Sequence, residues 1–202
     1  DDGHGGIGRD TVLVYAGTGT SFPSTPVVDS FDRANGPLGG DWTGLTTGLI
    51  VQDSTLTSSG GYATTVWNGA VFDTTQEAYF TLKQKTANCP QHDLMLKVQG
   101  LTYDSGHIEV RYDDNNKTVL VSTFTPGPGW ETRGGPYSLT LNAGDQFGAR
   151  AHGDGRVDVF VNGQLFTTAS VAGWAFAENG GRIGLTLDNI VNSRIEDFGG
   201  GT

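Results

Sequence analysis

The chain has 202 residues, of which 17% are charged, and its formal net charge is −10. This length fits one large domain with a terminal extension. An acidic surface repels phosphate backbones and anionic lipid headgroups, so we expect neither nucleic acid nor a membrane surface as a partner. The sequence also has no apolar run typical of a transmembrane segment or a signal peptide.

The composition is typical of an extracellular or cell-surface protein, because Gly, Thr, Ser and Asn are frequent and Lys is rare. Cys89 is the single cysteine, so stability must come from the core or from assembly rather than from a disulfide within the chain. The chain does not begin with Met, and we expect a processed product or a fragment. The triplet Asn116-Lys117-Thr118 matches a glycosylation sequon and predicts Asn116 as its acceptor.

The first 26 residues differ in character from the rest of the chain. A glycine-rich stretch precedes a β-prone run at residues 11–16, and a Gly/Thr stretch then leads to Phe22-Pro23-Ser24-Thr25-Pro26. The two prolines favour an extended linker that stays away from the domain. We therefore predict an N-terminal strand arm and linker over residues 1–26 and one domain over residues 27–202.

Short β-prone segments separated by turn signals fill the predicted domain. Turn signals such as Asn68-Gly69 and Asn179-Gly180-Gly181 recur at short intervals, and no long segment has helical apolar spacing. This pattern predicts an all-β protein built as a two-sheet antiparallel sandwich. The expected strands lie near residues 48–52, 55–58, 61–67, 77–86, 92–99, 106–112, 117–124, 137–141, 146–152, 156–161, 164–170, 182–187 and 193–198.

Alternation of apolar and polar residues predicts which side chains face the core. In the strand expected at residues 156–161, three valines alternate with other residues, and the following Asn162-Gly163 suits a type I′ hairpin turn. The same pattern predicts an outward row of Asp93, Met95, Lys97 and Gln99, and inward rows formed by Val157, Val159 and Val161, by Ala78, Phe80 and Leu82, by Leu94, Leu96 and Val98, and by Ile108, Val110 and Tyr112.

Two motifs of the domain carry a resemblance to a known family. The opening motif is Asp29-Ser30-Phe31-Asp32-Arg33-Ala34-Asn35-Gly36-Pro37-Leu38-Gly39 with Trp42, and the closing one is Gly181-Arg182-Ile183-Gly184-Leu185 with Ile195-Glu196-Asp197-Phe198-Gly199-Gly200-Gly201. Over about residues 27–201 the chain resembles concanavalin A-like (laminin-G-like) jelly-roll domains of secreted bacterial and phage type. The resemblance implies a jelly roll, a fold that hosts lectins, glycan-binding modules, glycosidases and structural domains. It also implies a structural Ca²⁺ where the opening and closing strands meet, with Asp29 and Asp197 as ligands.

The sequence lacks the catalytic string of the β-glucan-cleaving members of this fold. Those enzymes carry Glu-x-Asp-x-x-Glu on one strand, which places carboxylates on one face for retaining hydrolysis. We therefore predict that the protein is not an enzyme. His92-Asp93 and His107 do not have zinc-site spacing, and we interpret them as ordinary strand-end residues. The five glutamates are scattered through the sequence: Glu77, Glu109, Glu131, Glu178 and Glu196.

Aromatic side chains suit a carbohydrate site because they stack on pyranose faces while polar neighbours fix the hydroxyl groups. On this basis the candidate glycan-binding residues are Trp67, Tyr79, Arg111 and Trp130. Trp130 is expected in a Pro/Gly-rich loop at residues 126–130, where a large aromatic residue has no obvious core role; the alternative is that it covers the edge of the sandwich.

Two functions are compatible with these observations. The first is a structural or adhesive subunit of a surface filament, in which an apolar arm pairs with the sheet edge of another copy. The alternative is a carbohydrate-binding module of a larger secreted protein, with extracellular glycans as partners. In a third interpretation, residues 1–16 are the last strand of a preceding Ig-like repeat. The donated strand of the first hypothesis consists of Thr11, Val12, Leu13, Val14 and Tyr15.

Overall fold

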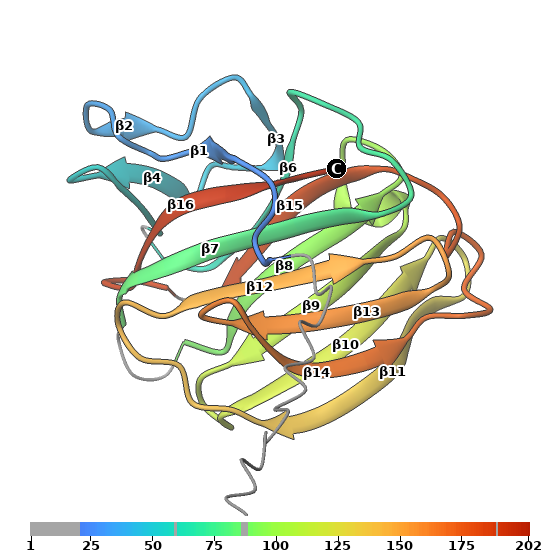
Figure 1. Cartoon of the computed structure of the whole chain (residues 1–202). Coiled ribbons are helices and arrows are strands. Elements are labelled where there is room, and N and C mark those ends of the chain that lie inside the picture. Colours follow the sequence, from blue (N-terminus) through green and yellow to red (C-terminus); the bar gives the residue numbers. More distant parts are fainter. Residues whose placement is uncertain (1–20, 59, 86–88, 189) are drawn as a thin grey trace, which may run out of the picture.

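The computed structural model describes residues 21–58, 60–85, 89–188 and 190–202 (Figure 1). This part of the chain consists almost entirely of strands, with one short 3-10 helix, η1 (Tyr103–Ser105). The strands are β1 (Val27–Asp29), β2 (Gly36–Pro37), β3 (Trp42–Leu45), β4 (Leu49–Gln52), β5 (Thr55–Ser58), β6 (Tyr62–Trp67), β7 (Gln76–Gln84), β8 (Gln91–Val98), β9 (His107–Asp113), β10 (Thr118–Thr125), β11 (Gly129–Ser138), β12 (Gln146–Ala151), β13 (Arg156–Val161), β14 (Gln164–Ser170), β15 (Arg182–Asp188) and β16 (Arg194–Gly201).

The strands form two antiparallel sheets that lie face to face (Figure 1). The nine-stranded sheet has the order β14-β13-β12-β7-β16-β5-β4-β2, with β1 paired to β16, and the seven-stranded sheet has the order β11-β10-β9-β8-β15-β6-β3. The predicted all-β jelly-roll sandwich is confirmed. No helix in the described ranges is long and apolar enough to cross a bilayer.

Strand β11 is longer than the sequence pattern indicated, because the Pro/Gly-rich residues 126–129 before it and Gly134-Gly135-Pro136 within it are typical of loops. It lies at the edge of the seven-stranded sheet and pairs with β10. Proline is tolerated on such an edge, since the side away from the neighbouring strand needs no ladder donor. Pro136 therefore sits within the strand, and Trp130 lies on it rather than in a loop.

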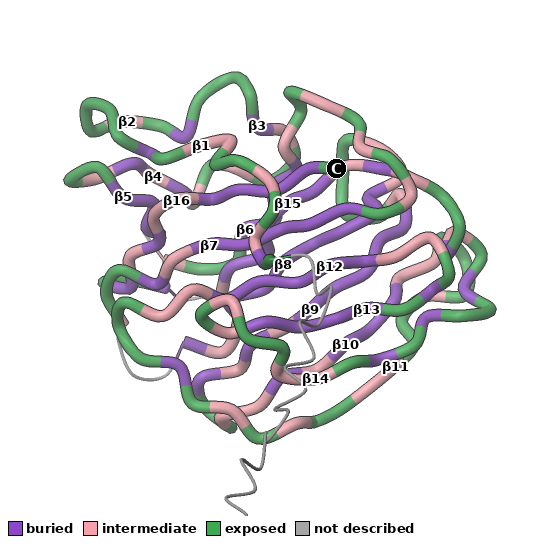
Figure 2. Tube along the Cα trace, in the orientation of Figure 1, coloured by how far each residue is buried: buried purple, intermediate pink, exposed green. Residues whose placement is uncertain are grey.

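The core lies between the sheets, and Figure 2 shows buried segments running through the middle of both layers. Val157 and Val159 are fully buried, and Val161 is partly buried against the same cluster. The predicted inward residues of β7 and β9, and those of β8 up to Leu96, also belong to this cluster. Because each fully buried Val, Leu, Ile or Phe contributes roughly 1.5–3 kcal/mol, these rows supply most of the driving force for folding.

The prediction that Lys97 faces outward is wrong. Its backbone has φ 51°, and the register of β8 against β15 shifts between Arg182 and Gly184. This irregularity breaks the alternation, so Val98 joins Met95 in a small separate cluster. The Lys97 side chain is fully buried, and its Nζ donates to the carbonyl oxygens of His152 at 2.9 Å and of Ala177.

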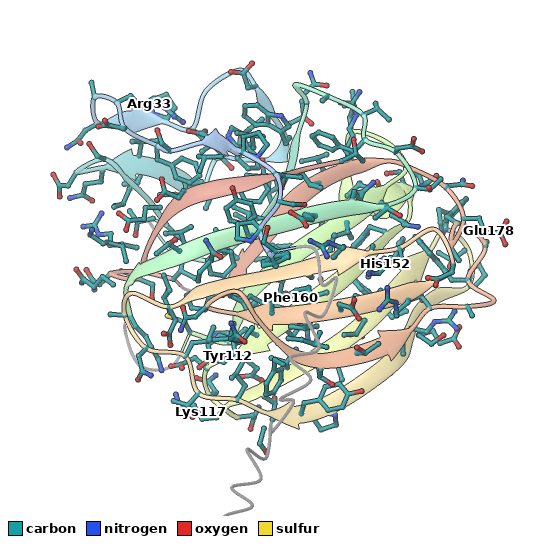
Figure 3. The ribbon with its side chains drawn as sticks, viewed as in Figure 1. Arg33, Tyr112, Lys117, His152, Phe160 and Glu178 are labelled. Atoms are coloured by element: carbon teal, nitrogen blue, oxygen red, sulfur yellow. The ribbon has the colours of Figure 1, made fainter. Side chains whose placement is uncertain are left out.

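The prediction that Pro23 and Pro26 hold the linker away from the domain is wrong for residues 21–26. Phe22 is 7% exposed and stacks on Phe160, which projects from the outer face of the nine-stranded sheet (Figure 3). Local sequence could not reveal this contact, because Phe160 lies far along the chain. The predicted donor strand, Thr11, Val12, Leu13, Val14 and Tyr15, lies outside the described residues.

We predict that Val159→Asp abolishes cooperative folding. A carboxylate buried without a partner costs several kcal/mol or more, against a total stability of about 5–15 kcal/mol. Leu165→Asp is the matched control, since Leu165 is 58% exposed on the neighbouring strand β14. Circular dichroism and thermal melting test both variants, and a folded Val159→Asp protein would show that the assigned face is wrong.

Candidate functional site

The outward side chains of the seven-stranded sheet include a cluster of buried charged groups. In β8 and β9, Leu94 and Val110 pack in the core. Because successive side chains of a strand point to opposite faces, Asp93, Glu109 and Arg111 point outward. Asp93 and Glu109 are 0% and 3% exposed even though they lie on an outer face. Something must therefore cover this part of the sheet.

Arg111 holds the two carboxylates together. Its Nη2 donates to Glu109 Oε1 at 2.9 Å, and its Nε lies 3.4 Å from Asp93 Oδ2. Turned so that its oxygen faces Arg111, the Gln91 amide accepts from Nη2 at 2.6 Å and from Nε at 3.0 Å. Asp93 Oδ1 has no hydrogen-bond partner in the described structure. One guanidinium thus serves two buried carboxylates, and one carboxylate oxygen is left over.

This shortage of positive charge changes the protonation of both acids. Burial raises the pKa of Asp93 well above its usual range, and the neighbouring Glu109 charge raises it further, while Arg111 opposes the shift. Burial also raises the pKa of Glu109, again against the effect of Arg111. A protonated Asp93 carries no charge, which relieves the cost of burying two carboxylates beside one arginine.

The loop between β8 and β9, which contains η1, lies beside strands β3 and β6 of this sheet. Thr43 Oγ1 on β3 donates to the Leu101 carbonyl oxygen at 3.0 Å. His107 Nδ1 lies 2.7 Å from the Tyr103 carbonyl oxygen. Between the loop and strands β3 and β6 lies a hollow of about 640 Å³. We call it the tyrosine hollow, and it is lined by Gly44, Leu45, Tyr62, Thr64, Thr102, Tyr103 and Asp104.

The three exposed aromatic side chains of the described residues all lie around this loop. Tyr62 and Tyr103 line the hollow and are 43% and 39% exposed, and Trp130 on β11 is 48% exposed. Burial, followed by the negative charges of Glu109 and Asp93, raises the pKa of Tyr62 to about 12. The Tyr62 hydroxyl therefore stays protonated and can donate a hydrogen bond at neutral pH.

An aromatic cluster continues from the hollow toward β11. The Tyr103 ring lies 6.1 Å from Phe124, and Trp130 lies 5.2 Å from both Phe124 and His107. His107 is fully buried among these rings, its Nε2 has no partner in the described structure, and burial lowers its pKa to about 4. His107 is thus a neutral packing residue that supports Tyr103 and Trp130 rather than an exposed strand-end histidine.

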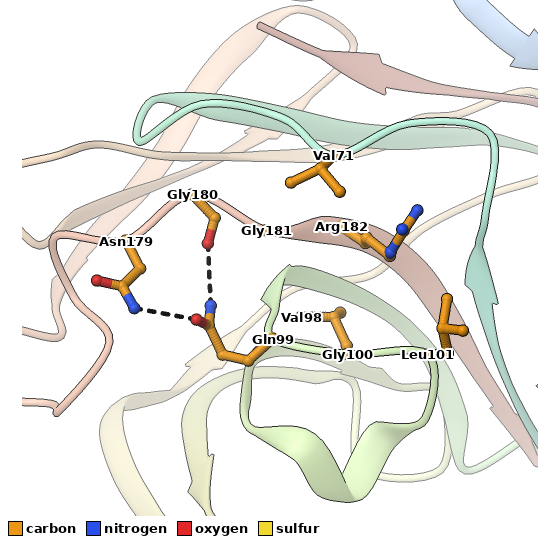
Figure 4. A pocket seen from close by; sticks show the side chains of 9 residues that line it. All are labelled: Val71, Val98, Gln99, Gly100, Leu101, Asn179, Gly180, Gly181 and Arg182. Carbon is orange, nitrogen blue, oxygen red and sulfur yellow. Dashed lines mark hydrogen bonds between the residues drawn. The ribbon is translucent and has the colours of Figure 1, made fainter.

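A second hollow, of about 500 Å³, lies beside the same loop (Figure 4). Gln99 Nε2 donates to the Gly180 carbonyl oxygen at 2.9 Å, and Asn179 donates to Gln99 Oε1 at 3.0 Å. Arg182 is held by the carbonyl oxygens of Asn68 and Ala70. Its polar side chains have partners within the chain, and none of its described lining residues has an exposed aromatic ring, whereas the tyrosine hollow has two.

The structure separates the four predicted glycan-binding residues. Arg111 and Trp130 both lie on the outward side of the seven-stranded sheet. Trp67 packs against the core, with its ring 5.4 Å from Trp42. Tyr79 lies on the other sheet, where its hydroxyl donates to the Thr25 carbonyl oxygen at 2.9 Å. The sequence analysis missed Tyr62 and Tyr103, although the alternation Tyr62, Thr64, Val66 in β6 indicates an outward row.

The predicted calcium ligands do not fit a cation. Both Asp29 oxygens accept from Arg33, at 2.6 and 3.1 Å, and the carboxylate also accepts from Trp42 Nε1 and the Phe31 amide at 2.8 Å each. A guanidinium in this position repels Ca²⁺ and uses the oxygens that would bind it. Asp197 lies on β16, next to Phe198, which pairs with Asp29 of β1. Among the described residues, no three His, Cys, Asp or Glu side chains converge as metal ligands.

Asn116 lies exposed in the turn between β9 and β10. Its Nδ2 donates to Asp113 Oδ2 at 2.7 Å, and its backbone amide donates to Asp113 Oδ1 at 3.1 Å. The side chain is accessible, so its glycosylation stays a prediction.

No family model and no curated protein matches the sequence. Several solved structures match its fold. The carbohydrate-binding module CBM66 from Bacillus subtilis aligns with a TM-score of 0.53 and 17% identity, over 78% of this chain and 91% of that one. An endo-β-1,3-glucanase from Pyrococcus furiosus aligns with a TM-score of 0.54 and 13% identity, over 85% and 90%. A LamA variant from Zobellia galactanivorans, in complex with laminaritriose and laminaritetraose, aligns with a TM-score of 0.57 and 10% identity, over 85% and 96%.

Identities this low show the fold alone, which is consistent with the concanavalin A-like jelly roll. They also correct one prediction. The sequence analysis excluded enzymatic activity because the Glu-x-Asp-x-x-Glu string is missing, but the matching structures include a glucanase, so the fold is compatible with a glycoside hydrolase. The exclusion was wrong because the absence of one sequence string does not rule out activity in a fold that is shared with a glucanase at 13% identity.

We predict that Asp93→Asn stabilises the protein more at about pH 8 than at about pH 4. Asp93 has a raised pKa in the folded state, so the folded protein retains a proton that the unfolded chain has lost. The free energy of unfolding therefore falls as the pH rises toward the folded pKa. The Asp93→Asn side chain does not titrate, so the variant avoids this pH-dependent loss of stability. Arg111 still pairs with Glu109 in the variant.

Thermal melting at the two pH values measures the effect, with a rise in Tm of about 2–4 °C for each kcal/mol gained. Asp104→Asn is the control, because Asp104 lies exposed at the rim of the same hollow. A difference between variant and wild type that is the same at both pH values would contradict the assignment of the proton.

Proposed function

We propose that this protein binds a neutral glycan in the tyrosine hollow. The observation that carries the proposal is the clustering of all three exposed aromatic side chains of the described residues, Tyr62, Tyr103 and Trp130, around the η1 loop. Exposed aromatic rings cost solvation free energy, and their concentration in one place is typical of a binding surface. The match to a carbohydrate-binding module of the same fold supports this function.

The lining of the hollow has the two kinds of group that sugar recognition requires. Tyr62 and Tyr103 provide aromatic surfaces for the apolar faces of pyranose rings. Thr102 and Asp104, both exposed, provide hydroxyl and carboxylate groups for the sugar hydroxyls. A volume of about 640 Å³ accommodates a short oligosaccharide rather than a single sugar ring.

The charge around the hollow favours a neutral ligand. Asp104 lies at the rim, and the Asp93–Glu109–Arg111 cluster lies near Tyr62, as the effect of both acids on the Tyr62 pKa indicates. Carboxylate or sulfate groups on a sugar would approach the exposed Asp104 carboxylate at the rim, and like charges repel. Uronic acids and sulfated glycans are therefore disfavoured.

Trp130 extends the proposed surface beyond the hollow. It is connected to Tyr103 through Phe124, with ring centroids 6.1 and then 5.2 Å apart. A glycan longer than the hollow can therefore meet a further stacking ring along the same face. Arg111, one third exposed, lies on the same sheet and can donate to a sugar hydroxyl.

We further propose that the protein acts outside the cell, as a carbohydrate-binding domain of a larger secreted protein. Its composition and the carbohydrate-related proteins that share its fold support this place of action. Assembly by strand donation stays a prediction, because residues 11–15 lie outside the described part of the chain. Glycan binding has the stronger support, because described residues form the proposed site and a carbohydrate-binding module has the same fold.

Alanine substitution of Tyr62 or Tyr103 should weaken glycan binding about tenfold or more. Loss of one stacked ring removes about 1.5 kcal/mol of contact, which corresponds to about tenfold in Kd. Binding is measured by affinity electrophoresis and calorimetry against neutral oligosaccharides, with laminaritetraose as the first probe and a polyuronic acid as the anionic comparison.

Two controls make this experiment specific. Tyr103→Phe retains the ring and should retain binding, and Leu165→Ala removes an exposed apolar side chain on the other sheet and should change nothing. Binding that is unchanged in both tyrosine variants, or a preference for the polyuronic acid, would contradict the proposed site.

A further inference from the structure

The outer face of the nine-stranded sheet holds residues 21–26 through side chains rather than through a strand ladder. Phe22 lies parallel to Phe160 with ring centroids 4.0 Å apart, and the guanidinium of Arg150 lies 5.7 Å from the centre of the Phe22 ring. Tyr79 meets Phe22 edge-on at 6.2 Å. Figure 1 shows the segment running from beside β12 across the front of β7 before it reaches β1.

The sheet is shaped to receive the aromatic ring. Gly148 lies between Tyr79 and Phe160 in the register of β7, β12 and β13. A Cβ atom added to Gly148 would overlap the Phe22 ring, and one added to Gly163 would lie 2.9 Å from the Phe22 carbonyl oxygen. Glycine at these positions therefore leaves a slot whose walls are Tyr79 and Phe160.

A carboxylate beside the slot recognises the residues that follow Phe22. Glu77 accepts from the Ser24 amide at 2.8 Å, from Ser24 Oγ at 2.9 Å and from Thr25 Oγ1 at 2.8 Å. Arg150 Nε donates to the same carboxylate at 2.7 Å, and Arg150 Nη2 donates to the Ser21 carbonyl oxygen at 3.1 Å. Burial alone would raise the pKa of Glu77, but these hydrogen bonds lower it overall, so the carboxylate is ionised.

The sheet does not depend on this segment for its own pairing. Strands β13, β12, β7 and β16 are consecutive neighbours in the ladder, so their backbone groups are paired without residues 21–26. The segment itself contributes one backbone bond typical of strand pairing, from the Gly200 amide to the Pro26 carbonyl oxygen at 3.1 Å. Its other contacts go to side chains that are fixed by the sheet.

We propose that the slot is a peptide-recognition site for an extended segment with an aromatic residue followed, two and three positions later, by Ser or Thr. The chain fills this site with its own residues 21–26, which act as a separable ligand and not as an integral part of the sandwich. The aromatic ring supplies the apolar contact, and the two hydroxyl residues satisfy the buried Glu77 carboxylate. The site therefore accepts the same segment in trans when its own copy is disabled.

Phe22→Ala in the full chain removes the aromatic contact of the resident segment and keeps Tyr79, Gly148 and Phe160, which form the slot. The probe is a synthetic peptide with the sequence of residues 21–26, blocked at both ends, with binding measured by calorimetry. We expect the Phe22→Ala chain to bind this peptide at least tenfold more tightly than the wild-type chain, whose slot is already filled. A peptide with Ala in place of Phe should not bind.

A second variant tests the location of the site. Phe22→Ala combined with Gly148→Ala fills the slot with a methyl group and should lose the peptide binding gained by Phe22→Ala alone. Three outcomes would overturn the proposal: equal binding by wild type and Phe22→Ala, binding that survives Gly148→Ala, and failure of the Phe22→Ala chain to fold. The last would make residues 21–26 an integral part of the fold.

Discussion

Phe80, Phe147 and Tyr112 join the two sheets in the middle of the sandwich, with ring centroids 5.8 and 6.1 Å apart. Phe80 and Phe147 lie on paired strands of one sheet, and Tyr112 belongs to β9 of the other. Successive side chains of a strand point to opposite faces, so when these residues face the core, the residues next to them in the sequence face outward. Glu77, Tyr79 and Gly148 on one sheet, and Asp93, Glu109 and Arg111 on the other, are placed outward by this constraint.

The two outer faces use this placement differently. On the seven-stranded sheet two buried acids share one arginine, and the η1 loop and strands β3 and β6 enclose a hollow lined by two tyrosines. On the nine-stranded sheet the N-terminal segment covers an Arg150–Glu77 ion pair that is almost fully buried. In both places charged groups lie on a sheet surface but are shielded from solvent. Such groups are stable there only when each has a hydrogen-bond or ion-pair partner. Asp93 is the exception, because its Oδ1 has no partner in the described structure and burial raises the pKa of its carboxyl group well above the usual range.

The sequence predicts the sandwich and most inward rows well, because alternation is a local signal that reflects burial directly. It predicts the outward position of Arg111 on its strand for the same reason, but it places Trp130 in a loop, whereas the residue lies on β11. It fails where contacts join distant segments: Ser24 and Glu77 are separated by 53 positions, and no local pattern indicates that they meet. It also fails at Lys97, where a backbone irregularity reverses the alternation, and at Asp29, where Arg33 four positions later occupies the carboxylate expected to bind calcium.

The buried amine of Lys97 has a consequence for chemical labelling. Its Nζ is enclosed between the His152 and Ala177 carbonyl oxygens, whereas Lys83 and Lys117 have side chains that are 58% and 43% exposed. An acylating reagent reaches an amine only when it is accessible, so the exposed lysines react at once and Lys97 reacts only after its end of the sandwich opens. The acylation rate of this one residue, followed by peptide mapping, thus reports how often the two sheets separate there while the rest of the molecule stays folded.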